Sequence, residues 1–155
     1  MSNMKLKTIL LSLFLLVAIP ASATMEDVQK AFKDKNYKQA FELIQPYAEA
    51  GDVVAQYNLA MMYATGDGTT VNDEKAVHWY IKAAKSGHTK AQNNLGLRYH
   101  KGNGVAVDKY MSLYWFIEAS KKGHLPSVFN IASIHSELIK EMLETEAEKQ
   151  LKDKQ

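Results

Sequence analysis

The sequence predicts an all-α protein built as an α-solenoid, a right-handed superhelix of antiparallel helix pairs. Three observations predict this class: an internal repeat of 36 residues, apolar positions spaced three and four residues apart, and glycines at the repeat boundaries. A single helix of about 12 residues is marginal in water, so helix pairs must stack to bury enough apolar surface. The 155 residues are 46% apolar and include no cysteine, which fits one domain held together by packing and excludes a disulfide scaffold.

The first 23 residues have the pattern of a secretory signal peptide. Lys5 and Lys7 precede an uncharged apolar run over residues 8–19, and the small residues 21–23 provide a cleavage site. The run is shorter than the roughly 20 residues that span a bilayer. We therefore expect cleavage of residues 1–23 by the Sec pathway rather than a retained membrane anchor, and a periplasmic or secreted protein of the bacterial envelope.

The mature chain is expected to be almost neutral. The full sequence has a net charge of +2, and the leader carries two lysines and no acidic residue. A neutral chain gives no electrostatic indication of nucleic acid or of an anionic membrane as partner, since both are bound through clustered basic residues.

Residues 24–52 are predicted to form a shorter helical pair that caps the N-terminal end. The two helices cover residues 24–33 and 36–50, and the segment lacks the glycine loop of the later units.

Residues 53–136 contain the repeats. The first helix of a unit runs from about Val53 to Ala64, and the second follows an N-cap residue, Asn72 or Asp108, and ends at a glycine. The repeated structural positions are Gly51, Ala55, Leu59, Tyr63, Gly66, Gly68, Trp79 and Gly87, then Leu95, Tyr99, Gly102, Gly104, Trp115 and Gly123.

Two sets of repeated side chains allow a structural or a ligand-binding interpretation. Trp79 and Trp115 lie beside small alanines, so we favour core packing over ligand contact. A ladder of Asn58, Asn94 and Asn130 follows the same period, and we favour hydrogen bonds that fix the stacking register over binding of an extended peptide.

Residues 137–155 are predicted to form an amphipathic C-terminal helix. Its apolar stripe consists of Leu138, Ile139, Met142, Leu143, Ala147 and Leu151. We expect this helix to cover the open end of the solenoid, and a partner-binding helix is the alternative.

The repeat resembles the Sel-1-like repeat family, which is related to tetratricopeptide repeats. The residues that match the family pattern in the second unit are Ala91, Leu95, Gly96, Tyr99, Gly102, Asn103, Gly104, Val105, Asp108, Trp115 and Gly123. The first unit matches similarly, except that Thr69 stands where the family prefers valine. The resemblance covers about residues 36–135.

The resemblance implies that the first helices line a concave surface that binds proteins. The residues placed there are Tyr57, Met61, Asn93, Leu97, His100, Phe129 and Ser133. Tyr57 and Phe129 are the expected anchors, because aromatic side chains dominate interface energetics. The alternative is that these residues simply form the inner side of a small solenoid.

No catalytic, metal or cofactor site is expected. The five histidines include no His-x-x-x-His pair, and there is no cysteine to act as a ligand or nucleophile. The two Gly-x-Gly loops lack the preceding strand and the Lys-Ser/Thr of a phosphate-binding loop.

We therefore expect a monomeric, non-enzymatic interaction scaffold that holds a protein or peptide. An inhibitor of a toxic effector enzyme in the periplasm is the alternative. A cell-wall or β-lactam hydrolase is the third hypothesis, and it is weakened because the relatives linked to that activity contain paired cysteines.

Overall fold

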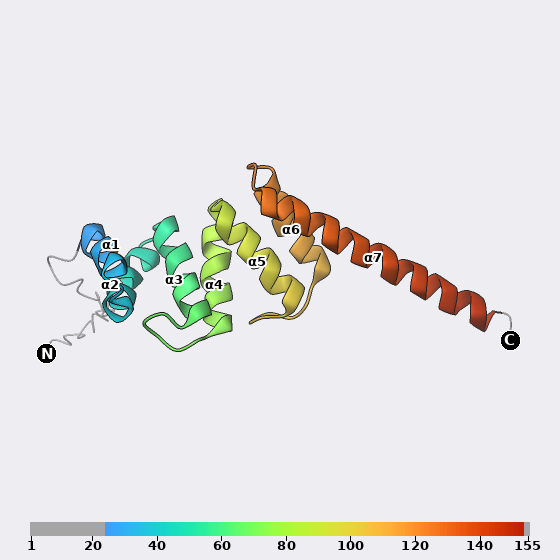
Figure 1. Ribbon diagram of the computed structural model, residues 1–155, viewed down its shortest axis with the longest axis horizontal. Helices are drawn as coiled ribbons and strands as arrows, with labels where there is room; N and C mark the ends of the chain where they lie inside the picture. The colour runs from blue at the N-terminus through green and yellow to red at the C-terminus, as the bar shows by residue number, and fades with distance from the viewer. Residues whose placement is uncertain (1–23, 154–155) are drawn as a thin grey trace, which may run out of the picture.

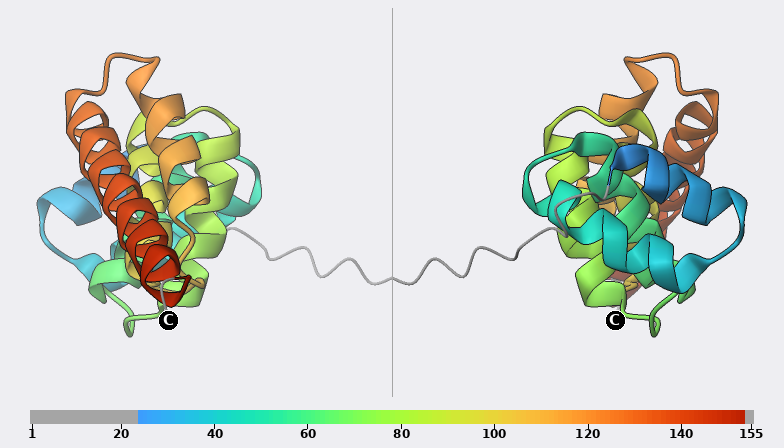
Figure 2. Two further views of the ribbon diagram at one scale, coloured as in Figure 1. Left: turned by 90° about the vertical axis from the view of Figure 1, so that its right-hand side faces the viewer. Right: turned by 90° about the vertical axis from the view of Figure 1, so that its left-hand side faces the viewer.

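The computed structural model describes residues 24–153, which form seven α-helices arranged in a row (Figure 1). The helices are α1 (Met25–Lys33), α2 (Tyr37–Glu49), α3 (Val53–Thr65), α4 (Asp73–Lys85), α5 (Thr89–Lys101), α6 (Lys109–Ser120) and α7 (Leu125–Lys152). Each helix packs chiefly against its neighbours in sequence. Seen from its two ends, the row has α7 in front at one end and α1 and α2 in front at the other (Figure 2). The predicted all-α architecture of antiparallel pairs is confirmed, and the predicted signal peptide lies outside the described residues.

Polar side chains cap the second helices as predicted. The Asn72 side-chain oxygen accepts a hydrogen bond from the Lys75 backbone N–H at 2.8 Å, and Asp108 accepts one from Met111 at 2.8 Å. Each cap satisfies an N–H that has no partner within its helix.

The two tryptophans differ in burial, although they occupy one repeat position. Trp115 is 7% exposed and lies in the core, as predicted. Trp79 is only partly buried at the edge of the core, and the Lys82 ammonium lies 4.1 Å from its ring centroid. Trp79 therefore packs against the core, as predicted, but it is less buried than Trp115 and also carries a cation–π contact.

A buried glutamine links successive hairpins at two junctions. The Gln56 side-chain amide donates to the Ala48 carbonyl at 3.2 Å, and Gln92 donates to the Ala84 carbonyl at 3.1 Å. Each bond ties the start of a first helix to the end of the preceding second helix. The sequence analysis overlooked this pair, although the two glutamines lie 36 residues apart.

The second glycine of each loop touches the preceding hairpin. A Cβ on Gly68 would overlap the Tyr37 carbonyl at the start of α2, and a Cβ on Gly104 would overlap the Asp73 carbonyl at the start of α4. Both glycines also have a positive φ of 74°. The glycines therefore permit a close approach between hairpins as well as the turn itself.

The C-terminal part differs from the prediction. The predicted segment 137–155 is described up to residue 153, and this part does not form a separate capping helix, because α7 is one helix of 28 residues that begins at Leu125. Side chains from Ile139 to Gln150 are exposed, and this half of α7 projects beyond the other helices (Figure 1). The chain has Leu138 where the earlier units have Gly66 and Gly102, so nothing ends the helix and turns it back over the last hairpin.

We predict that Gly104→Ala destabilises the protein more than Gly123→Ala. Both glycines have a positive φ, which costs alanine about 1 to 2 kcal/mol, but a Cβ on Gly123 meets nothing within 4 Å. The overlap with α4 should add about 1 to 3 kcal/mol for Gly104→Ala. Urea unfolding followed by circular dichroism measures the difference, and equal losses would contradict the close-approach role.

We predict that Trp115→Ala lowers the free energy of unfolding by about 3 to 5 kcal/mol, because it empties a buried site. Trp79→Ala is the matched control and should lower it less, since its ring is partly exposed. Urea melts of both variants test this, and a loss below about 1 kcal/mol for Trp115→Ala would refute its core role.

Candidate functional site

Three of the predicted binding residues meet at a hollow in the seam between α3 and α5. Tyr57 and Met61 of α3 and Leu97 of α5 line a space of about 400 Å³. Met61 is 37% exposed, so its side chain remains accessible to a partner. Together they form the apolar part of a groove.

The polar wall of this hollow comes from residues outside the predicted concave surface, although one of them, Asn94, belongs to the predicted asparagine ladder. Tyr80, Asn94, Arg98 and Lys101 form most of it, and Ala64, Thr65 and Asn103 complete the lining. Arg98 pairs with the Asp73 carboxylate, and its guanidinium lies 6.0 Å from the Tyr80 ring centroid. The sequence contained an indication that Arg98 is functional, because a charged residue stands at a repeat position that is apolar elsewhere. The equivalent residues in the other units are Met62 and Ile134, and both are buried.

Tyr57 separates this hollow from a second one on the same seam. The second hollow measures about 500 Å³ and is lined by Val54, His88 and Lys90. The rings of Tyr57 and His88 stack with centroids 4.3 Å apart. We call the two hollows together the seam groove. Burial raises the pKa of Tyr57 and of Tyr80, so both groove tyrosines are neutral at physiological pH.

His88 begins α5 as its N-cap. Its Nδ1 accepts a hydrogen bond from the Ala91 backbone N–H at 3.2 Å, which requires an unprotonated Nδ1. Burial lowers the His88 pKa, and the charges of Lys90 and Lys122 lower it further.

Asn93 does not line the seam groove. It is 9% exposed, and its side-chain oxygen accepts hydrogen bonds from the Ser127 hydroxyl at 2.9 Å and from the Asn130 amide at 3.1 Å. These bonds join α5 to α7. The ladder prediction is thus supported at Asn130, and also at Asn94, whose amide donates to the Tyr80 hydroxyl at 3.3 Å.

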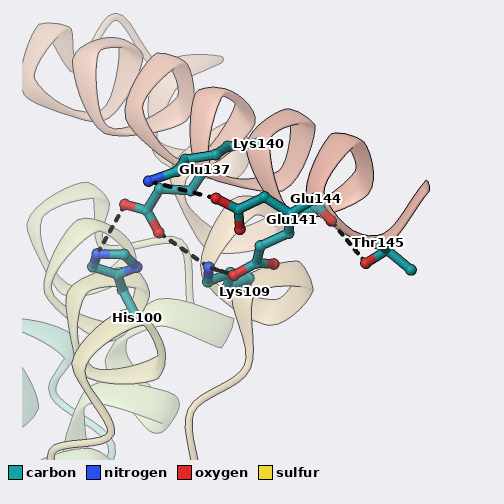
Figure 3. A network of polar contacts seen from close by, with 7 residues as sticks. All are labelled: His100, Lys109, Glu137, Lys140, Glu141, Glu144 and Thr145. Carbon is teal, nitrogen blue, oxygen red and sulfur yellow. Dashed lines mark hydrogen bonds and ion pairs between the residues drawn. The ribbon is translucent and has the colours of Figure 1, made fainter. Parts of the chain in front are cut away.

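His100 also contributes to the junction with α7 (Figure 3). Its Nε2 lies 3.7 Å from a Glu137 carboxylate oxygen, and Lys109 pairs with both Glu137 and Glu141. Lys109 occupies the repeat position of Tyr37 and Asp73, where the earlier junctions use a glycine contact. Ion pairs therefore replace the glycine contact at the last junction.

Phe129 lies on the exposed side of α7, away from the seam groove. Ser133 is exposed as well, but it lines a small pocket of about 30 Å³ together with Leu97 and His100. Phe129 is 75% exposed. Its equivalents, Tyr57 and Asn93, face the first helix of the next unit, and within the described residues no further helix follows α7. The structure therefore does not place Phe129 beside Tyr57 as a second anchor of one groove.

The described residues contain no group of three His, Asp or Glu side chains that could hold a metal ion. Over the same part of the chain, no helix is both long enough and apolar enough to cross a bilayer.

Comparisons with known proteins identify the repeat. Residues 26–52, 53–88 and 89–124 each match the family model of the Sel1 repeat. The first match falls on the segment that the sequence analysis treated as an N-terminal cap. A comparison with curated protein sequences gives no match.

Two solved structures resemble the chain. A Sel1 repeat protein from Oxalobacter formigenes is 30% identical with a TM-score of 0.68, and the match covers 74% of this chain and 47% of that protein. A protective antigen of uropathogenic Escherichia coli with an SLR fold is 40% identical with a TM-score of 0.62. That match covers 64% of this chain and 22% of the antigen. The chain thus spans less than half the length of either protein.

The cap formed by His88 predicts a pH-dependent stability. The folded-state pKa lies below the ordinary value of about 6.5, so the unfolded chain binds the proton more tightly. The stabilisation is complete above about pH 6.5 and is lost as the pH falls through that value and then through the folded-state pKa.

When the pH falls from about 7.5 to about 5.5, we expect the free energy of unfolding to decrease less in His88→Asn than in the wild type. The reason is that asparagine caps a helix without titrating. Urea unfolding at both pH values measures this. An identical pH dependence in both proteins would show that His88 does not act as described.

Proposed function

Since the chain belongs to the Sel1 repeat family, we propose that it is a non-catalytic scaffold that holds a segment of a partner protein in the seam groove. Helical repeat proteins generally mediate protein interactions through extended surfaces. The observation that carries the proposal is the hollow between α3 and α5, where Tyr57, Met61 and Leu97 converge.

The lining of the seam groove indicates the chemistry of the bound segment. Tyr57, Met61 and Leu97 fit an apolar side chain as anchor. Lys101 is exposed at the edge of the hollow, and residues 75–122 contain nine basic residues against two acidic ones. The segment should therefore combine an apolar anchor with acidic side chains, because opposite potentials attract and orient a partner.

The same groove supports a binding role rather than catalysis. Its acidic neighbour Asp73 is paired with Arg98, and His88 is occupied in capping α5. Thr65 also lines the groove, and its hydroxyl donates to the Asp67 carboxylate at 2.7 Å. Among the contacts of the described residues no third side chain orients that carboxylate, as a nucleophile–base–orienter set requires. We accordingly propose no enzymatic activity.

We also propose that the protein acts in the bacterial envelope, as a periplasmic or secreted protein. The support is the sequence of residues 1–23, with its lysines, its short apolar run and its small-residue cleavage site. Recovery of the chain in the periplasmic or culture fraction, with a mature N-terminus at Thr24, tests this proposal. A full-length chain in the cytoplasm or membrane would contradict it.

The binding proposal predicts that Met61→Glu reduces partner capture by about tenfold or more, equivalent to about 1.4 kcal/mol. A charge placed among Tyr57, Met61 and Leu97 opposes the apolar anchor and repels acidic side chains. Affinity purification from envelope extracts followed by mass spectrometry identifies the partner, and titration with the purified partner measures the loss.

Phe129→Ala is the matched control, because Phe129 is exposed and lies outside the seam groove. It should leave capture unchanged and the free energy of unfolding within about 0.5 kcal/mol. Loss of binding in the Phe129 variant with full binding in the Met61 variant would reject the groove. A toxic enzyme as the captured partner would identify the inhibitor role instead of the adaptor role.

A further inference from the structure

The last helix carries an apolar stripe that no other part of the described chain covers. We call it the terminal stripe, and it consists of Val128, Ala132, His135, Ile139, Met142 and Leu143, all exposed. Met142 and Leu143 are 71% and 67% exposed. Their spacing of three and four residues places the six side chains on one face of α7.

The earlier units show what kind of element covers this face. The Phe116 ring of α6 packs over Gly96 of α5, so closely that a Cβ on Gly96 would meet it at 2.7 Å. Ala60 occupies the same repeat position in α3 and is fully buried. Ala132 is the equivalent in α7, and it is exposed. The terminal stripe is thus the surface on which a second helix, antiparallel to α7, would pack.

A hollow of about 470 Å³ lies beside the stripe. It is lined by Tyr110 of α6 together with His135, Ile139 and Met142 of α7. Tyr110 and Tyr114 are 74% and 50% exposed and lie one turn apart on α6. These two rings enlarge the exposed apolar surface beside the stripe. A specific interface needs to bury about 1,000 Å² in total.

We propose that the terminal stripe binds the same stripe of a second copy, so that α7 of each copy serves as the missing second helix of the other. The stripe is centred near His135. A two-fold axis at this point pairs the helices antiparallel, with Ala132 opposite Ile139 and Val128 opposite Met142. Small side chains thereby face large ones, as Gly96 faces Phe116. The interface is isologous, which means that both copies use the same surface.

The charges agree with this arrangement. Glu146 follows Met142 by one turn on the face of the stripe and lines the same hollow. With the axis near His135, it lies opposite residue 124 of the second copy, where α7 begins. The positive end of the helix dipole lies there. A carboxylate therefore meets a helix N-terminus at both ends of the interface.

Light scattering after size exclusion of the purified chain tests the assembly. We expect the wild type to reach twice the chain mass as concentration rises from micromolar to near-millimolar. Met142→Glu should stay at the chain mass, since it buries a charge in the interface, and its exposed position leaves folding unchanged by circular dichroism. Val71→Glu, a change at an exposed valine outside α7, is the matched control and should remain dimeric.

Cysteine cross-linking tests the position of the axis, because the chain contains no cysteine of its own. His135→Cys should form a disulfide-linked dimer on mild oxidation, since the two copies of this residue meet at the axis. Lys140→Cys is the control. Residue 140 lies on another face of α7, and its two copies are separated by about 15 Å along the helix axis, so this variant should form no disulfide-linked dimer.

A wild type that stays monomeric over the whole range, or equal cross-linking of the two cysteine variants, would overturn the proposal. A monomer that instead binds an amphipathic helix of another protein through Met142 would also overturn it. The seam groove does not include the terminal stripe, so Met61→Glu separates a failure of groove binding from a failure of dimerisation. This proposal departs from the monomer expected from the sequence.

Discussion

The stacking of the hairpins depends on the close contact between the second glycine of a loop and the first residue of the preceding second helix. At the α4 junction this contact joins Gly104 to the Asp73 backbone. The Asp73 carboxylate in turn pairs with Arg98, whose guanidinium forms part of the seam groove. The contact that sets the spacing of the repeats therefore also positions the cationic wall of the groove.

Local patterns made most of the fold predictable. The 36-residue period, the N-caps at Asn72 and Asp108 and the helix-ending glycines depend on residues close in sequence, and the structure agrees with them. Burial depends on which neighbour covers a face. Asn93 is enclosed by α7, whereas Phe129, at the same repeat position, is exposed. A pattern within one unit could not distinguish these two positions.

The last junction shows how a missing glycine changes an element. Leu138 stands where the earlier loops begin, so α7 continues as a straight helix. Its Glu137 and Glu141 then reach Lys109 at the position that a glycine contact occupies elsewhere. The sequence analysis detected the apolar stripe but expected it to fold back, because solenoids usually cover their ends.

The nearest-neighbour packing also governs how the molecule responds to force. Each hairpin touches chiefly the hairpins beside it, so tension applied at the two ends would extend the chain stepwise, from the outermost elements inward. The seam groove lies at the centre of the row, between α3 and α5. A partner held there would stay bound while the terminal helices unfold. The outer helices would therefore absorb the applied force before the binding site is disrupted.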